Sequence, residues 1–157
     1  IPSTKHLLCF YFRIFTTHIK VSNKHGQAVA KHYVIITYPA QGHINPALQF
    51  AEHLIRLGVH VTFFTTIGAH RHSMIKSPPP NGLSFATFSN GYNDGVVPVE
   101  DRDKGWDQLK RNGSKALVDL IVSTANKQCI VYTMLQHWAT DVARELHLPS
   151  ALLWIQP

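Results

Sequence analysis

The stretch Tyr33–Leu57, YVIITYPAQGHINPALQFAEHLIRL, decides the fold of this chain. It begins with an apolar run, 33–38, rich in β-branched and aromatic residues and too short for a helix, which predicts a strand buried on both faces. After a short loop, Asn45 and Pro46 supply an N-cap and a first helical residue, and apolar residues then recur at helical spacing as far as Gly58. We therefore expect a strand, a tight turn and a helix.

His43 falls in the predicted turn, just outside the amino end of that helix. The positive end of the helix dipole disfavours an imidazolium there and favours a neutral ring that can accept a proton. His43 is thus placed like a general base. The residues alone leave a second reading equally open, in which this histidine only satisfies hydrogen bonds of the loop.

The rest of the chain repeats the alternation of strand and helix. Further strands are expected at 59–65, 83–88, 129–133 and 150–155, and further helices at 106–125 and 138–147. The stretches 66–77 and 89–103 are expected to be surface loops. The first has little periodicity and leads into three prolines at 78–80, and the second contains several turns with glycine or aspartate. This pattern predicts an α/β fold, a Rossmann-like doubly wound parallel sheet.

The common strand order of such sheets, 3-2-1-4-5, makes the first and fourth strands neighbours, and ligands bind beyond the carboxyl ends of strands at the switch point. We therefore expect His43 to lie beside Thr133 and Met134 in one crevice. The loop around His43 has one glycine where a dinucleotide-binding loop needs more, which disfavours a nucleotide cofactor there.

The segment Gln41–Pro46, QGHINP, carries a family resemblance. It looks like the opening motif of plant family 1 UDP-sugar glycosyltransferases, and the similarity runs from about Lys31 to Pro157. Other phrases that fit are GVHVTF at 58–63, PNGLSF at 80–85, NGYNDG at 90–95 and VAREL at 142–146. Together they resemble the branch of crocetin, anthocyanidin 5-O- and hormone glucosyltransferases.

The resemblance implies the N-terminal, acceptor-binding domain of a GT-B glycosyltransferase. In such an enzyme His43 would deprotonate an acceptor hydroxyl of a small plant aglycone, whereas a carboxyl acceptor would react already ionised. The acceptor would attack the sugar of a UDP-sugar such as UDP-glucose with inversion. The Trp-rich donor-binding box of the family has no counterpart in these 157 residues, so no donor residue, metal or bound cofactor is expected here. This polypeptide alone is therefore expected to be inactive. The alternative is an inactive truncated product or a non-catalytic α/β module that binds a small ligand.

One position departs from the family pattern. Many members carry, at the end of the fourth strand, an Asp that orients the catalytic histidine, and here that position is Thr133. Thr133 is the possible partner of His43. The expected acceptor-binding residues are Gln41, Gly42, Gly91, Tyr92, Met134 and Trp138.

Charge and cysteine content narrow the function classes. Five of the fifteen Lys and Arg residues lie before residue 33, where there is no acidic residue, so the remainder is nearly neutral. No basic patch interleaved with aromatics occurs, which argues against nucleic-acid binding. Cys9 and Cys129 are far apart and indicate neither a disulfide framework nor a zinc site, so a cytoplasmic location is the default.

The first thirty residues differ from the rest. Residues 1–30 fit a signal peptide poorly, because Arg13 interrupts their apolar run, and a transit peptide stays open. We expect an extension, disordered or foreign to the domain, at 1–30 and the acceptor-binding domain at 31–157. No run is long and apolar enough to predict a membrane span.

Overall fold

The computed structural model describes residues 32–73, 78–94, 97–124 and 128–155. The expectation for residues 1–30 falls outside these ranges. The described elements, in chain order, are β1 (His32–Ile36), α1 (Gln41–Arg56), β2 (His60–Thr66), α2 (Ile67–Ser73), β3 (Leu83–Phe88), the 3-10 turn η1 (Val99–Asp101), α3 (Arg102–Ser123), β4 (Gln128–Thr133), the 3-10 turn η2 (Met134–Gln136), α4 (Ala139–Glu145) and β5 (Ser150–Leu153).

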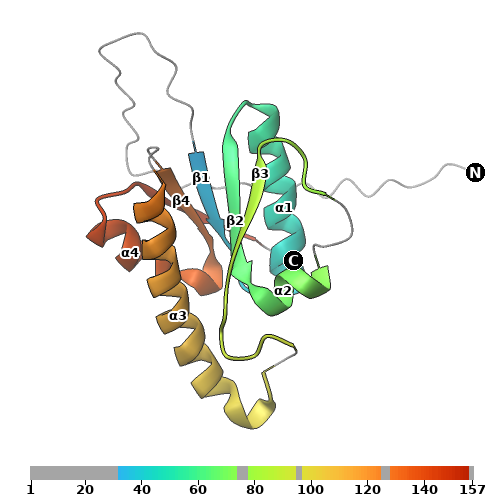
Figure 1. Ribbon diagram of the computed structural model, residues 1–157, viewed down its shortest axis with the longest axis vertical. Helices are drawn as coiled ribbons and strands as arrows, with labels where there is room; N and C mark the ends of the chain where they lie inside the picture. The colour runs from blue at the N-terminus through green and yellow to red at the C-terminus, as the bar shows by residue number, and fades with distance from the viewer. Residues whose placement is uncertain (1–31, 74–77, 95–96, 125–127, 156–157) are drawn as a thin grey trace, which may run out of the picture.

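The five strands form one parallel sheet in the order β3-β2-β1-β4-β5 (Figure 1). The predicted doubly wound order is confirmed. β1 is central, and its residues 34–36 are at most 1% exposed, as expected of a strand covered on both faces. Its apolar run leaves no polar face, because each face meets a different layer of helix.

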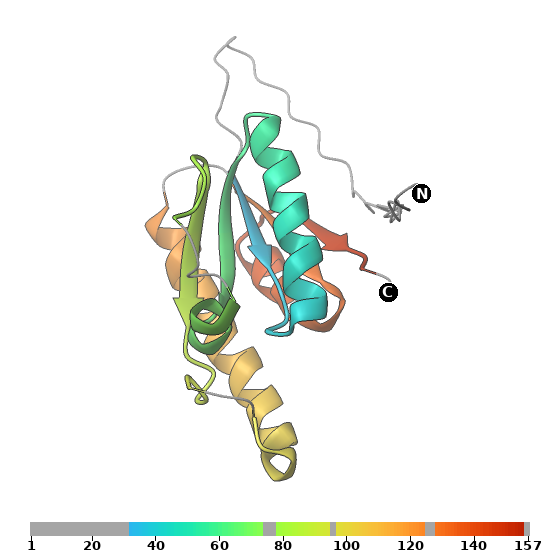
Figure 2. The same cartoon turned by 90° about the vertical axis from the view of Figure 1, so that its right-hand side faces the viewer.

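The two faces of the sheet carry separate cores. Val34 and Ile36 of β1 pack with Leu117 of α3 and Val142 of α4, whereas Ile35 packs with α1 and its apolar residues 44, 47, 50 and 51. Figure 2 shows α1 on one side of the sheet and α3 on the other. The helix pattern of α1 is therefore the pattern of the residues that cover one face.

α1 begins earlier than predicted, and this corrects the expected turn. Its N-cap is Ala40 in an extended conformation, so residues 41–45 belong to the helix and Pro46 lies inside it. Pro46 has no N–H with which to bond the Gly42 carbonyl, a loss that is tolerable this near the helix start. The helix ends as predicted, since Gly58 has a φ of 77°, where glycine is unstrained.

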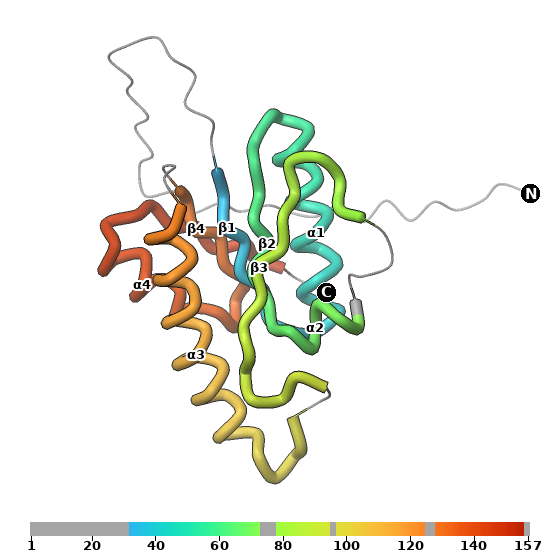
Figure 3. The backbone as a smooth tube through the Cα atoms, in the orientation of Figure 1, coloured from blue at the N-terminus to red at the C-terminus, as the bar shows by residue number. Residues whose placement is uncertain are grey.

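α2 and η1 lie in stretches that were predicted to be loops. Thr66 caps α2, because its hydroxyl accepts a hydrogen bond from the Ala69 N–H at 3.2 Å. Gly68 allows the helix to approach the segment after β3, since a Cβ there would lie 3.2 Å from the Asn93 carbonyl oxygen. The described part of that segment, as far as Asp94, extends beyond the carboxyl end of the sheet, and α3 begins at Arg102, four residues before the predicted start (Figure 3).

Candidate active site

His43 lies in the first turn of α1, and not in a turn before the helix. Its backbone N–H and that of Ile44 both donate to the Ala40 carbonyl at 2.9 Å. The imidazole therefore stands at the positive end of a sixteen-residue helix, directly after the carboxyl end of β1. The helix dipole therefore acts on His43 as predicted from the sequence, although the residue is helical and does not lie in a turn.

The imidazole is half-buried and packed against an aromatic ring. Tyr38 meets His43 edge-on, with 5.6 Å between the ring centroids and an interplanar angle of 67°. The Nδ1 atom of His43 is buried and has no hydrogen-bond partner. Desolvation lowers the pKa of His43 below its ordinary value, because burial penalises the charged form. The ring is thus held as a neutral imidazole near neutral pH.

Thr133 ends β4 and is fully buried. Its hydroxyl accepts a hydrogen bond from the Tyr38 backbone N–H at 3.3 Å. This contact joins the ends of β1 and β4 and lies close to His43 in sequence. It does not involve the His43 imidazole. A direct pairing of Thr133 with His43 stays a prediction.

A cleft of about 890 Å³ opens beyond the carboxyl ends of β1, β2 and β3. Its walls come from the start of α1 and the residues before it, the end of β2, α2, the segment after β3 and the start of α3. The lining residues are Tyr38, Pro39, Gln41, Ile44, Thr66, Gly68, Ala69, His72, Asn90, Tyr92, Asp94, Val97, Arg102, Asp103, Gly105, Trp106 and Leu109. The predicted crevice between β1 and β4 is not where this cleft lies. The end of β4 instead runs into η2, whose Gln136 is buried.

The cleft combines aromatic walls with a polar floor. Tyr38, Tyr92 and Trp106 supply three aromatic side chains, and Tyr38 and Trp106 contact each other with 5.7 Å between ring centroids. Asn90 is buried, and its Oδ1 accepts a hydrogen bond from the Tyr92 N–H at 3.2 Å, which fixes the turn that presents Tyr92. Such a surface suits a flat, mostly apolar ligand with a few polar groups.

An ion pair ties two walls of the cleft together. The Arg71 guanidinium donates to the Asp94 carboxylate at 2.8 Å and so joins α2 to the segment after β3. Both side chains are exposed, so the pair contributes little to stability, of the order of 0–1 kcal/mol. The ion pair instead holds the segment after β3 in position beside α2.

The structure brings some of the predicted site residues together and separates others. Gln41 and Tyr92 line the cleft, whereas Gly42, Gly91 and Met134 do not. Trp138 is a core residue, 2% exposed, whose Nε1–H donates to Gln136 Oε1 at 2.6 Å. A tryptophan at helical spacing with apolar neighbours is as typical of a core as of a pocket. Here Trp138 packs against α3 and belongs to the core.

Several cleft residues were not found by sequence reasoning. Thr66, His72 and Asn90 come from the ends of strands and from α2, and Trp106 comes from α3. Thr66, a residue type that is favoured at helix N-caps, is the sequence signal that could have predicted α2. Trp106 was recognised only as the start of a helix, because no periodicity shows which way its first turn faces.

Neither a metal site nor a membrane helix is found in the described ranges. The His, Cys, Asp and Glu side chains placed by the structure form no group of three or more that could hold a metal ion. Likewise, among the residues described, no helix has the length and apolar character needed to cross a bilayer.

Sequence comparison finds plant glucosyltransferases. Phloretin 4'-O-glucosyltransferase of Malus domestica is 47% identical over 134 residues, which are 82% of this chain and 28% of that protein. The crocetin glucosyltransferase, chloroplastic, of Gardenia jasminoides is 50% identical over 133 residues, 81% of this chain and 28% of that protein. The chain thus spans less than a third of the length of these relatives. No protein-family model matches the chain.

Structural comparison agrees. The crystal structure of Os79 from O. sativa in complex with U2F and trichothecene superposes with a TM-score of 0.67 at 28% identity, covering 80% of this chain and 29% of that one. The structure of Arabidopsis thaliana UGT89C1 complexed with quercetin has a TM-score of 0.58 at 21% identity, covers 76% of this chain and 33% of that one, and supports the fold alone. The fold expected from the resemblance, the N-terminal part of a GT-B glycosyltransferase, is confirmed.

Proposed function

We propose, from the premise that this chain is similar to plant family 1 UDP-glycosyltransferases, that it is the acceptor-binding half of an inverting UDP-sugar-dependent glycosyltransferase. The substrate class is a small plant aglycone with a reactive hydroxyl or carboxyl group, and the sugar is glucose. The observation that carries the proposal is the position of His43, in the first turn of α1 and against Tyr38, which lines the cleft.

His43 acts as the general base in this proposal. Because Nδ1 is buried without a partner, the proton is taken at Nε2. The acceptor O–H bond breaks as its oxygen attacks the anomeric carbon, and the bond from that carbon to the UDP phosphate oxygen breaks. UDP leaves with the bonding electrons and the sugar inverts. The proton stays on the imidazole until solvent or product removes it.

The aglycone binds in the cleft lined by Tyr38, whose ring contacts His43, although His43 itself is not among the lining residues. The three aromatic side chains of the cleft can stack on a flat ring system, and Asn90 and Thr66 offer polar groups at its floor. The UDP-sugar is held by groups outside these 157 residues, as the family resemblance implies. The expected acceptor-binding residues Gln41 and Tyr92 are kept in this proposal.

The test is a chimera in which this chain replaces the matching part of the Gardenia crocetin glucosyltransferase. Turnover of UDP-glucose with crocetin and with phloretin is measured for the parent chimera and for His43→Ala. We expect His43→Ala to lower kcat with the phenolic acceptor by roughly 10²–10⁴-fold, the contribution typical of a general base. His53→Ala, at an exposed position of the same helix, is the matched control and should leave turnover unchanged.

Two outcomes would count against this function. A His43→Ala chimera with near-normal turnover would reject the base assignment. A folded chimera that binds phloretin but transfers no sugar, whatever stands at position 43, would favour the non-catalytic binding module.

The domain boundaries and location are part of the same proposal. We take residues 31–157 as the acceptor-binding domain, residues 1–30 as an extension to it, and the cytoplasm as its compartment. Deleting residues 1–30 should leave the affinity for the aglycone unchanged, which isothermal calorimetry measures. Imaging of a fluorescent fusion of the chain in plant cells tests the compartment.

A further inference from the structure

Tyr38 is the side chain that contacts His43 and also reaches the cleft. Its ring lies edge-on to the imidazole at 5.6 Å and tilted against Trp106 at 5.7 Å. Tyr38 and Trp106 both line the cleft. The three rings therefore form a row that leads from the imidazole on α1, across the end of β1, to the first turns of α3.

A hydrogen bond to Nδ1 is the usual device for orienting a catalytic histidine. Here Nδ1 of His43 is buried and has no hydrogen-bond partner, so no such bond fixes the tautomer. The hydroxyl of Thr133, at the position where the family often has an acid, accepts from the backbone N–H of Tyr38 instead. Ring packing is thus left to hold the imidazole.

We propose that Tyr38 is the positioning residue of His43, its ring replacing the carboxylate that many relatives use. The inference rests on the proposed function of His43 as a base. Thr133 acts one step further away, because it anchors the backbone of Tyr38, and Trp106 supports the ring from the other side. The edge of an aromatic ring is electropositive and its face electronegative, so an edge-to-face contact fixes ring orientation without a hydrogen bond.

Tyr38 also explains why the imidazole is dehydrated. Its ring covers part of the imidazole surface, and desolvation is the cause of the lowered pKa of His43. Removing the ring should admit water and raise that pKa toward the ordinary value. This shift is a property of the 157-residue chain and needs no catalysis to be measured.

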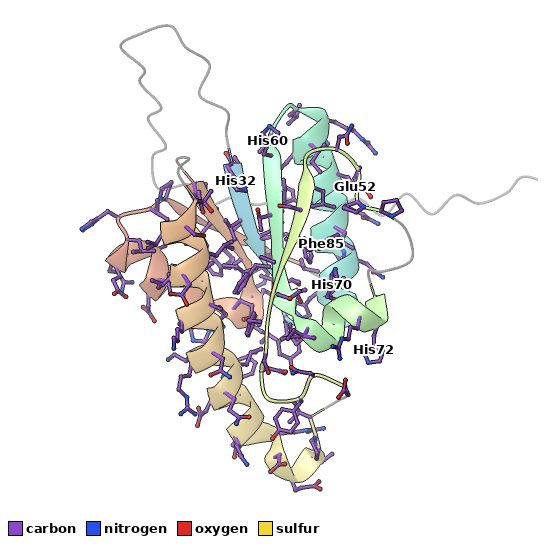
Figure 4. All side chains as sticks on the ribbon, viewed as in Figure 1. His32, Glu52, His60, His70, His72 and Phe85 are labelled. Atoms are coloured by element: carbon purple, nitrogen blue, oxygen red, sulfur yellow. The ribbon has the colours of Figure 1, made fainter. Side chains whose placement is uncertain are left out.

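The first experiment is an NMR titration of the 157-residue chain labelled with ¹⁵N in its histidines. The variants are Tyr38→Leu, which removes the ring, and Tyr38→Phe, which keeps it. Phe85→Leu is the matched control, because Phe85 contacts a different histidine, His70, at 5.0 Å between ring centroids, and both lie on the other side of the molecule from α3 (Figure 4). We expect Tyr38→Leu to raise the pKa of His43 and change its tautomer ratio, and Tyr38→Phe and Phe85→Leu to leave both unchanged.

The second experiment measures kcat and its pH profile in the chimera. Tyr38→Leu should lower kcat about 10²-fold, the loss typical of a misplaced catalytic group, and move the acid limb of the profile to higher pH. Tyr38→Phe should restore both. Equal titrations of His43 in the parent and in Tyr38→Leu would overturn the inference, as would a Phe variant as impaired as the Leu variant.

The failure of the proposed function looks different from the failure of this inference. If His43→Ala keeps normal turnover while Tyr38→Leu shifts the His43 titration, the base role is rejected, and with it the catalytic role of Tyr38. If His43→Ala abolishes turnover while Tyr38→Leu changes neither the titration nor kcat, the base stands and Tyr38 does not position it.

Discussion

At the scale of single residues, His32 and His43 make the stability of the fold depend on pH. Desolvation, together with the charge of His60 for His32, lowers the pKa of both histidines below 6.5. His32 and His60 are paired in register at the amino end of β1 and β2 (Figure 4). Because the unfolded chain binds these protons more readily than the native one, protonation favours unfolding.

The sign of this effect gives a prediction for His32. Stability should be complete above about pH 6.5 and should fall as the pH drops below it toward the native pKa values. His32→Gln removes one of the two titrating groups while a side-chain amide can still bond Thr62, which His32 Nε2 contacts at 2.8 Å. The urea midpoint of this variant should therefore fall less than that of the parent between about pH 7.5 and about pH 5.

The control for this comparison is His53→Gln, at an exposed position of α1. Its pH dependence should match that of the parent chain. A His32→Gln variant with the parent's full pH dependence would show that the unfolding by acid has another origin.

The residue scale is also where sequence reasoning about the site was incomplete. His43 was found because its motif places it at the junction of β1 and α1, which chain connectivity alone determines. The partner of Thr133 could not be found in this way. Its hydroxyl bonds to the backbone of Tyr38, 95 residues away in sequence, and such a contact depends on the register of β1 against β4.

At the scale of elements, α3 carries a glycine whose role is steric. A Cβ at Gly113 would lie 2.8 Å from Cη2 and 2.9 Å from Cζ2 of Trp138, closer than real contacts allow. Gly113 weakens the helix propensity of α3, yet it leaves the space that the indole of Trp138 fills. This is why a helix-breaking residue occurs in the middle of a 22-residue helix.

Gly113→Ala should therefore destabilise the protein although alanine is the better helix former. Overpacking costs about 1–3 kcal/mol and outweighs the gain in propensity of about 1 kcal/mol. Gly42→Ala is the matched control, because Gly42 is also helical and nothing lies within 4 Å of its added Cβ. Thermal or urea unfolding measures both, and Gly42→Ala should be neutral or stabilising. Stabilisation by both substitutions would show that the indole can move aside.

The elements that the sequence predicted well are those whose apolar pattern reflects one layer of the fold. The third strand, residues 83–88, has the predicted bounds, and the strand order follows from the alternation of strands and helices. The start of α1 and the whole of α2 were missed. Ala40 caps α1 without a side-chain hydrogen bond, so no capping residue marks where the helix starts. α2 packs close to the carbonyls of residues 92 and 93, a contact that depends on the tertiary structure.

The expectation that the site lies where β1 meets β4 stays a prediction. Strand order placed it beside Thr133 and Met134, which are not among the residues that line the cleft, and β4 continues into η2, whose Gln136 is buried. Which side chains line a cleft depends on their packing, and packing at a strand end cannot be read from periodicity. The cleft opens beyond the carboxyl ends of β1, β2 and β3, and its lining includes Asn90 and Tyr92 from the segment after β3.

At the scale of the whole molecule, the 157-residue polypeptide should bind an aglycone and transfer no sugar. Holding two reactants in attack geometry is worth roughly 7–11 kcal/mol of the barrier, and the proposed function gives this chain groups for one reactant. Calorimetry should show weak binding of phloretin and none of UDP-glucose, and an assay for glucoside should show no product. Measurable binding of UDP-glucose or turnover by the polypeptide would contradict the assignment of the donor site to other residues.

The row of rings that ends at Trp106 gives the molecule an optical signal. The three indoles differ in setting: Trp138 is 2% exposed, Trp154 is 45% exposed, and Trp106 stands in the cleft wall against Tyr38. An absorbing aglycone in the cleft should quench the emission of Trp106, so a Trp154→Phe variant can be titrated without any label. Replacement of Trp106 by Phe in that variant should abolish the quenching, and the quenching curve then gives the affinity of the cleft directly.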